Sequence, residues 1–149
     1  MKRFYPNSLP SFPNEPLPTK FEIKKISSSV GEGVVTLRSF KKGDTVCAFT
    51  GYLVNFITQF SLTLGENLHI HDPYFMGKIL HSCDPNTHCD MSRRVFIAKR
   101  DIKAGEIITM DYAQTEPKLY KPFDCSCGAP NCRGFVNGYL EQQLAEHFL

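Results

Sequence analysis

Four cysteines constrain this chain more than any other part of its sequence. Cys125, Cys127 and Cys132 form a C-x-C-x4-C array near the C-terminus, and Cys83 lies far upstream of them. Three thiolates are too few to close a tetrahedral zinc site, which needs four ligands. Cys83 could supply the fourth. A metal ion held in this way would tie the tail of the chain back onto its middle.

The main alternative to a metal site is a set of disulfides, because the chain has six cysteines. The single residue between Cys125 and Cys127 suits chelation better than a bridge. The N-terminus carries charge but no apolar region of a secretory signal, which disfavours an oxidising compartment. Cys89 and His88 compete with Cys83 for the fourth position. We therefore expect an intracellular protein, cytoplasmic or, if eukaryotic, nuclear, with one structural zinc ion.

Length and charge exclude several classes of protein. A chain of 149 residues is long enough for one domain with a sizeable core. Its 17 basic and 15 acidic residues nearly balance, so no overall basic field favours nucleic acid. No apolar run approaches the roughly 20 residues that span a bilayer. We expect neither direct nucleic-acid binding nor a membrane segment.

Short segments rich in β-branched and aromatic residues follow one another from residue 21 onward. Turns with glycine and charged residues separate them. The expected strands are 21–26, 34–37, 45–54, 59–64, 68–70, 94–98 and 107–110. These segments predict a mainly β architecture with irregular connections.

The two ends of the chain differ from this pattern. Residues 1–19 form a proline-rich arm, with prolines at 6, 10, 13, 16 and 18, which exclude a regular helix or a central strand. We expect an extended arm or a disordered leader, with the fold beginning near residue 20. Apolar residues at helical spacing, Leu140, Leu144 and Phe148, predict a short C-terminal helix over 139–149.

Residues 37–46 and 99–108 resemble one another. Each has a strand end, an apolar residue, a turn that ends in glycine (Gly43 or Gly105), an acidic residue and a new strand. Such turns are typical of the corners of small sheets. We interpret the repeat as structural rather than as a binding site.

Four motifs resemble, in order, those of the SET-domain protein-lysine methyltransferases. They are Gly31-Glu32-Gly33 for the family's G-x-G, Phe49-Thr50-Gly51 for Y-x-G, LHSCDPN at 80–86 for N-H-S-C-x-P-N, and EIITMDY at 106–112 for E-L-x-F-D-Y. The cysteine array, followed by Arg133 and Gly134, is similar to the family's post-SET segment. The resemblance implies a SET-domain fold over 20–116, made of several small curled sheets with a pseudoknot-like threading, and a post-SET zinc-binding segment over 117–138.

The same resemblance implies S-adenosylmethionine as the methyl donor and a lysine-bearing protein or peptide as the substrate. The implied cofactor-binding residues are Gly31, Glu32, Gly33, Leu80, His81, Tyr112 and Phe135, and the implied zinc ligands are Cys83, Cys125, Cys127 and Cys132. Phe135 takes the place of an aromatic residue that packs on adenine. For His81 and Phe135 the alternative is plain packing in the core.

Tyr112 takes the place of the family's catalytic tyrosine, whose hydroxyl lies beside the reacting methyl group. Phe49 and Met110 would line the channel for the lysine, where apolar surroundings lower the pKa of an amine and favour its reactive neutral form. In relatives a tyrosine at the position of Met110 holds a water molecule and limits the product. Methionine cannot, so we expect higher methylation states.

Two departures from the family's motifs leave alternatives open. Leu80 replaces an asparagine and Phe49 a tyrosine, so one alternative is a catalytically inactive, SET-derived protein-binding module. Another is methylation of a non-histone protein or of a small amine. Separately, His69, His71 and Asp72 could bind a metal from one strand, but we favour solvated loop residues there.

Overall fold

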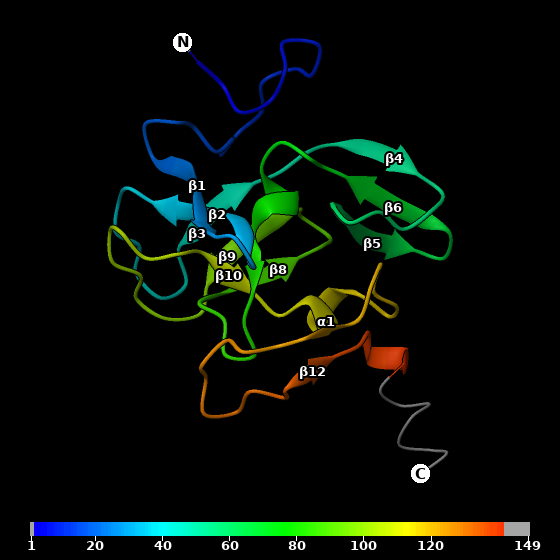
Figure 1. Cartoon of the computed structure of the whole chain (residues 1–149). Coiled ribbons are helices and arrows are strands. Elements are labelled where there is room, and N and C mark those ends of the chain that lie inside the picture. The colour runs from blue at the N-terminus through cyan, green and yellow to red at the C-terminus, as the bar shows by residue number, and fades with distance from the viewer. Residues whose placement is uncertain (1, 142–149) are drawn as a thin grey trace.

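A computed structural model describes residues 2–141 of the chain, which fold into five small sheets (Figure 1). The strands are β1 (Phe21–Ser27), β2 (Gly31–Thr36), β3 (Thr45–Ala48), β4 (Tyr52–Val54), β5 (Ser61–Gly65), β6 (Leu68–His71), β7 (Leu80–His81), β8 (Thr87–Asp90), β9 (Val95–Ala98), β10 (Thr109–Met110), β11 (Phe123–Asp124) and β12 (Phe135–Val136). The chain also contains two short helices, η1 (Met76–Lys78) and α1 (Tyr112–Thr115). The expected mainly β architecture is confirmed.

The sheets contain two or three strands each. The antiparallel ones are β1-β2, β3-β9-β8, β4-β6-β5 and β11-β12, whereas β7 and β10 pair in parallel. The parallel pair joins two of the motifs, because Leu80 lies opposite Thr109 and His81 opposite Met110. The side chain of Asn86 strengthens this junction by donating to the carbonyl of Ile107 at 2.9 Å.

The expected strand over 45–54 is divided into β3 and β4. At Gly51 a Cβ atom would come within 2.3 Å of the carbonyl oxygen of His71, so the backbones approach too closely for any side chain. The sequence analysis missed β7, β8, β11 and β12. Three of these have only two residues, and β8 is a polar Thr-His-Cys-Asp segment without alternation.

The two similar segments pair with each other. Phe40 and Ile102 are both buried and exchange two backbone hydrogen bonds of 2.8 Å. The turns beside them use Gly43 and Gly105 at φ of 91° and 95°, a region that glycine adopts without strain. The two segments therefore pair with each other at one corner of the fold, which supports a structural role for the repeat.

The N-terminal arm packs against the core, contrary to the expectation that the fold begins near residue 20. Tyr5 is 2 % exposed and its hydroxyl donates to Oδ2 of Asp72 at 2.6 Å. The carbonyl of Asn14 accepts from the amide of Ala48 at the end of β3. The arm contains turns but neither helix nor strand between residues 2 and 20. It is an ordered part of the fold, so a disordered leader is the wrong interpretation.

The tail runs below α1 in Figure 1, on the opposite side of the molecule from the arm. It builds a second, smaller apolar cluster in which Cys83, Leu119 and Val136 are buried. Residues 139–141 are helical, while Leu144 and Phe148 lie outside the described residues, where the expected helix is not tested. None of the helices in residues 2–141 has the length and apolar character that crossing a bilayer requires.

Candidate functional site

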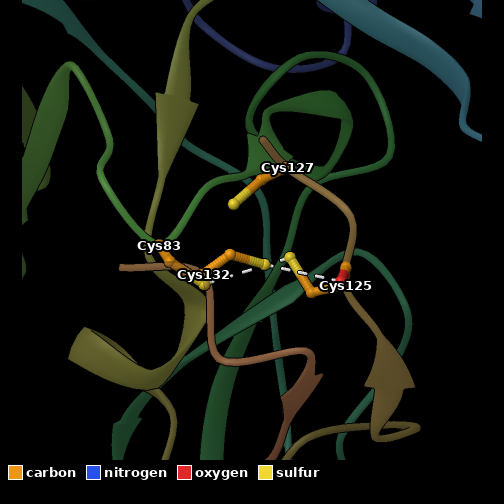
Figure 2. Close-up of side chains that lie close together, drawn as sticks. All are labelled: Cys83, Cys125, Cys127 and Cys132. Atoms are coloured by element: carbon orange, nitrogen blue, oxygen red, sulfur yellow. Dashed lines mark hydrogen bonds between the residues drawn. The ribbon is translucent and has the colours of Figure 1, made fainter. Parts of the chain in front are cut away.

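The thiol groups of Cys83, Cys125, Cys127 and Cys132 converge (Figure 2). All four sulfur atoms lie within 4.8 Å of one another, and Cys83 and Cys125 are 3.9 Å apart. At ~2.3 Å per Zn–S bond, the sulfurs of a tetrahedral site stand about 3.8 Å apart. Within residues 2–141, no other group of three or more His, Cys, Asp or Glu side chains is close enough to share a metal ion. The donor set fits a zinc ion closed by four thiolates.

The competing fourth ligands lie elsewhere. Cys89 is buried in the main core, where its thiol contacts the sulfur of Met91 at 3.3 Å. His88 is exposed on β8. Neither belongs to the cysteine cluster. The structure thus brings together the four cysteines that the sequence analysis named.

Turns with glycine give the tail the shape that the cluster needs. Gly128 and Gly134 have φ of 80° and 75°. The amide of Cys125 donates to the carbonyl of Gly134 at 2.8 Å, which closes the loop between β11 and β12. The side-chain amide of Asn131 donates to the carbonyl of Cys83 at 3.0 Å and ties the loop to the segment after β7.

The electrostatic surroundings of the thiols differ. Backbone hydrogen bonds at Cys83 and Ala129 lower the pKa of Cys127 to about 6, whereas burial raises the pKa of Cys125 to about 12. Arg133 donates to the sulfur of Cys83 from its backbone amide at 3.5 Å and from Nε at 3.3 Å. Such donors stabilise thiolates, the form that binds metal.

His81 links the cluster to Tyr112. Its Nδ1 accepts from the amide of Tyr112 at 3.1 Å, so the proton of the neutral ring is on Nε2, which lies 3.5 Å from the sulfur of Cys83. Burial lowers the pKa of His81 to about 4, so the ring is neutral near pH 7. The ring packs 5.1 Å from that of Tyr112 and 5.4 Å from that of Phe123. These contacts support the structural interpretation of His81.

The hydroxyl of Tyr112 is fixed at the wall of a cavity of about 160 Å³. It donates to the carbonyl of Ile79 at 2.7 Å, and burial raises its pKa to about 12, so it stays protonated. With its hydrogen on Ile79, the oxygen keeps its lone pairs for other contacts. Met110 lines the same cavity, together with apolar residues that include Leu62 and Phe123.

Phe49 is not among the residues that line this cavity. It is 3 % exposed, and its ring packs 5.3 Å from that of Phe96 in the main core. The structure therefore brings Tyr112 and Met110 together at the cavity and places Phe49 apart from it.

The Gly31-Glu32-Gly33 motif opens β2 and meets the third motif. Gly31 has a φ of 83°, and a Cβ atom there would meet nothing within 4 Å. Glu32 accepts from Nζ of Lys78 at 2.7 Å, just before β7. Gly33 lies against the side chain of Leu80, so two of the expected cofactor-binding segments are adjacent.

Phe135 is 51 % exposed on β12, which excludes plain core packing. It pairs with Asp124 across the small β11-β12 sheet. An exposed aromatic ring is available to stack on a ligand.

Glu116 is a buried cavity residue that the sequence analysis missed. Its carboxylate accepts from the amide and the hydroxyl of Thr63 at 2.8 and 2.9 Å. Burial raises its pKa. Since Thr63 is far away in sequence, no local pattern could have identified this pair.

His69, His71 and Asp72 are structural residues rather than solvated loop residues. His69 and Asp72 are buried, at 7 % and 0 % exposed. The Nδ1 atoms of His69 and His71 pair with threonine hydroxyls at 3.0 and 2.8 Å. Asp72 accepts from Tyr5 and from the amides of residues 74–76. The preference for solvated residues was wrong, and the three do not form a metal cluster.

Residues 31–113, more than half of the chain, match the family described as "SET domain". The chain is 34% identical over 90 residues to "Methyltransferase flvH" of Aspergillus flavus, covering 59% of this chain and 51% of that protein. It is 36% identical over 138 residues to "Histone-lysine N-methyltransferase ash1" of Drosophila melanogaster, covering 80% of this chain and 6% of that protein. The chain thus spans about half the length of the first relative and a small part of the second.

Solved structures show the same fold. KRYPTONITE in complex with mCHG DNA and SAH superposes with a TM-score of 0.63 at 25% identity, covering 77% of this chain and 28% of that chain. The methyltransferase domain of human SETMAR gives 0.62 at 20% identity, covering 79% and 58%. The described part of this chain therefore shares its overall fold with these proteins.

Proposed function

We propose that this chain, which belongs to the SET-domain family, is the catalytic domain of an S-adenosylmethionine-dependent protein-lysine methyltransferase. The observation that carries the proposal is the Tyr112 hydroxyl, held by Ile79 at the wall of a cavity that Met110 shares. Relatives named as methyltransferases support it. Because this chain spans only part of those relatives, the activity is inferred from the site.

We propose that the residues around the first and third motifs bind the cofactor. We expect the open side of Gly31, the segment at Leu80 and His81 that begins against Gly33, and the exposed ring of Phe135 to contact it. A neighbouring structure contains SAH, the product of the same cofactor. When bound, S-adenosylmethionine supplies a methyl group activated by a sulfonium. The protein's task is then alignment and exclusion of water.

The cavity suits an amine that must lose its proton. Met110, Ile79 and Leu62 form the apolar part of its wall, which lowers the pKa of a lysine amine that lies against them. The oxygen of Tyr112 keeps lone pairs for weak C–H···O contacts with electron-poor groups, because its hydrogen is used by Ile79. Met110 donates no hydrogen bond to a water molecule, in keeping with higher methylation states.

The four cysteines support a structural role for zinc. A site closed by four thiolates has no open position for a substrate. It would hold the tail that carries Phe123, which lines the cavity, and Phe135, which is exposed on β12. Zinc therefore supports the proposed activity by shaping the site.

We propose a lysine-bearing protein or peptide as the substrate, in line with the histone-lysine methyltransferases among the relatives. We expect the activity inside the cell, where such substrates occur. The DNA in the KRYPTONITE structure belongs to that protein and is not proposed for this chain.

The test is methyl transfer from labelled S-adenosylmethionine to a panel of histones, other proteins and small amines by the zinc-loaded chain. We expect label on protein lysine, lost in Tyr112→Phe and retained in the control Tyr139→Phe, whose ring is exposed. Calorimetric titration with the cofactor accompanies the assay. Failure of the zinc-loaded chain to bind cofactor, with or without peptide, would favour the inactive binding module. Transfer to small amines alone would change the substrate class.

A further inference from the structure

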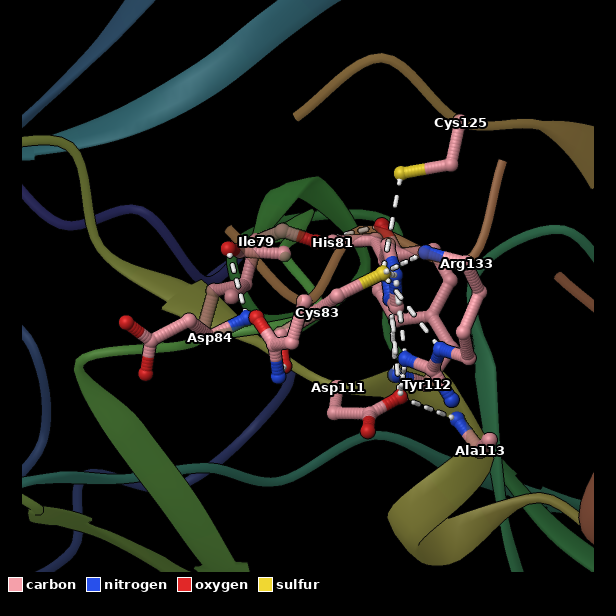
Figure 3. A network of polar contacts seen from close by, with 11 residues as sticks. Ile79, His81, Cys83, Asp84, Asp111, Tyr112, Ala113, Cys125 and Arg133 are labelled. Carbon is pink, nitrogen blue, oxygen red and sulfur yellow. Dashed lines mark hydrogen bonds and ion pairs between the residues drawn. The ribbon is translucent and has the colours of Figure 1, made fainter. Parts of the chain in front are cut away.

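Arg133 lies between the cysteine cluster and the segment that contains Tyr112, and its side chain contacts both (Figure 3). Its Nε donates to the sulfur of Cys83 at 3.3 Å, and its Nη2 donates to Oδ1 of Asp111 at 2.8 Å. Asp111 directly precedes Tyr112, so a single guanidinium joins a thiol of the metal cluster to the neighbour of the proposed catalytic residue.

The Asp111 carboxylate also organises the backbone after it. Its Oδ1 accepts from the amide of Ala113 at 3.0 Å and caps the N-terminus of α1. The next amide, that of Tyr112, donates to Nδ1 of His81, whose Nε2 faces the sulfur of Cys83. Two connections, through Arg133 and through His81, therefore run from one sulfur atom to residues 111–113.

The position of Arg133 follows from the fold of the tail. Gly134 has a φ of 75° and turns the chain directly after it. The backbone amide of Arg133 donates to the same sulfur at 3.5 Å, so both the backbone and the side chain are fixed on Cys83. The side chain is 29% exposed and that of Asp111 25%, so the ion pair is partly shielded from solvent.

We infer that Arg133 is a positioning residue, which couples the thiolate metal site to the orientation of Tyr112 through Asp111. For its effect on catalysis the inference rests on the proposed function. A guanidinium suits this role, because its fixed fork of donors contacts two acceptors at once, which a lysine ammonium does less well. Its positive charge also offsets the negative charge of a site closed by four thiolates.

Substitution of a residue that hydrogen-bonds to a metal ligand typically lowers metal affinity or activity by about 10- to 100-fold. A shift of about 1 Å at a reacting group costs on the order of 100-fold in rate. A residue that acts on both the metal and Tyr112 should therefore affect zinc retention and the rate of the chemical step. It should leave ground-state binding of cofactor and peptide largely unchanged.

Three variants separate these effects. Arg133→Met keeps the apolar stem and removes every side-chain donor. Arg133→Lys keeps the charge and loses the fork. Asp111→Asn removes the partner charge of Arg133 while retaining a residue that caps helices well. Arg100→Met is the matched control, because Arg100 contacts Asp84 and Pro85, next to Cys83, without touching its sulfur.

The experiment compares these full-length, zinc-loaded chains in three assays. They are zinc release to a chromogenic chelator, hydrogen exchange of the Tyr112 amide, and kcat and KM for methyl transfer. For Arg133→Met we expect zinc release about 10-fold faster, faster exchange at Tyr112, and kcat lower by about 10- to 100-fold with KM nearly unchanged. Arg133→Lys should recover zinc retention more than kcat, and Arg100→Met should match the unmodified chain.

Asp111→Asn gives the decisive comparison. We expect normal zinc release with faster exchange at Tyr112 and a lower kcat. The variant loses the ion pair between Arg133 and residue 111 but keeps the contact between Arg133 and Cys83. Unchanged exchange at Tyr112 in this variant would overturn the inference. If Arg133→Met loses its zinc entirely, Asp111→Asn still decides. If the unmodified chain transfers no methyl group, the proposed function fails, while the exchange data still establish or refute the coupling.

Discussion

Gly33 lies so close to Leu80 that a Cβ atom at residue 33 would come within 2.7 Å of the Cδ1 atom of Leu80 and 3.0 Å of the Cγ1 atom of Ile26. The glycine of the first motif and the leucine that departs from the third motif thus share one packing contact. The leucine occupies space that the missing side chain of Gly33 leaves open.

Gly33→Ala should therefore force the Leu80 side chain to shift, at a cost of about 1 kcal/mol, the low end of the usual range for overpacking. It should also weaken cofactor binding, because the displaced side chain of Leu80 lies at the proposed cofactor site. Thermal unfolding and calorimetric titration with S-adenosylmethionine measure the two effects.

Gly65→Ala is the control for this substitution, because a Cβ atom there meets nothing within 4 Å. Adding Leu80→Ala to Gly33→Ala should restore part of the lost binding, since contacting residues couple. Additive losses in the double variant would argue against the shared contact.

Tyr5→Phe should destabilise the folded chain by about 1.5–3 kcal/mol, the usual loss for a hydrogen bond to a charged group. Its hydroxyl is the arm's donor to the buried carboxylate of Asp72. Chemical denaturation measures the change. Tyr52→Phe, which loses only an exposed contact with the Tyr74 hydroxyl, should cost little. Equal stability of the Tyr5 variant and the unmodified chain would contradict a stabilising role for the hydrogen bond between Tyr5 and Asp72.

Local patterns in the sequence are sufficient to predict most of the strands and the cysteine cluster. Most strands with β-branched residues lie where the pattern predicts them. The spacing of Cys125, Cys127 and Cys132 indicates a metal site that lacks one ligand, and Cys83 completes the observed cluster. Thiol chelation leaves a pattern in the sequence because its geometry admits few ligand sets.

The features that were missed depend on contacts between distant residues. Tyr5 and Asp72 are buried together although both lie in polar, turn-rich segments, and Glu116 is buried because Thr63 supplies its donors. Phe49 holds a motif position, yet packing against Phe96 places it in the core. Burial of this kind follows from tertiary packing, which propensity and spacing do not encode.

Cys83→Ser should lower the zinc content of the purified chain from one equivalent to well below it, because the cluster loses a buried ligand. The tail should then lose protection from proteolysis around 123–136, where the cluster fixes the loop. Metal analysis by atomic emission and limited proteolysis measure these effects. Cys89→Ser is the matched control, since that thiol is buried outside the cluster. Loss of zinc in the control but not in Cys83→Ser would identify Cys89 as the ligand.

Glu116 should make stability fall as the pH rises through a defined window. Burial raises its pKa in the folded chain, so the folded state holds this proton more tightly than the unfolded state does. Between the ordinary value of about 4.3 and the raised value, the folded state binds more protons, and the free energy of unfolding decreases with increasing pH. Below this window the contribution is fully present.

Glu116→Gln removes the titration and should remove this part of the pH dependence. The substitution also removes one of the two oxygens that accept hydrogen bonds from Thr63, and the resulting loss of stability does not depend on pH. Denaturation of both chains at several pH values separates this constant loss from the pH-dependent part. The stability of the unmodified chain relative to the variant should decline as the pH rises through the window. Glu66→Gln, at an exposed position, controls for the loss of one carboxylate. A relative stability that rises over this range would mean that the donors of Thr63 outweigh burial and that Glu116 is held as a carboxylate.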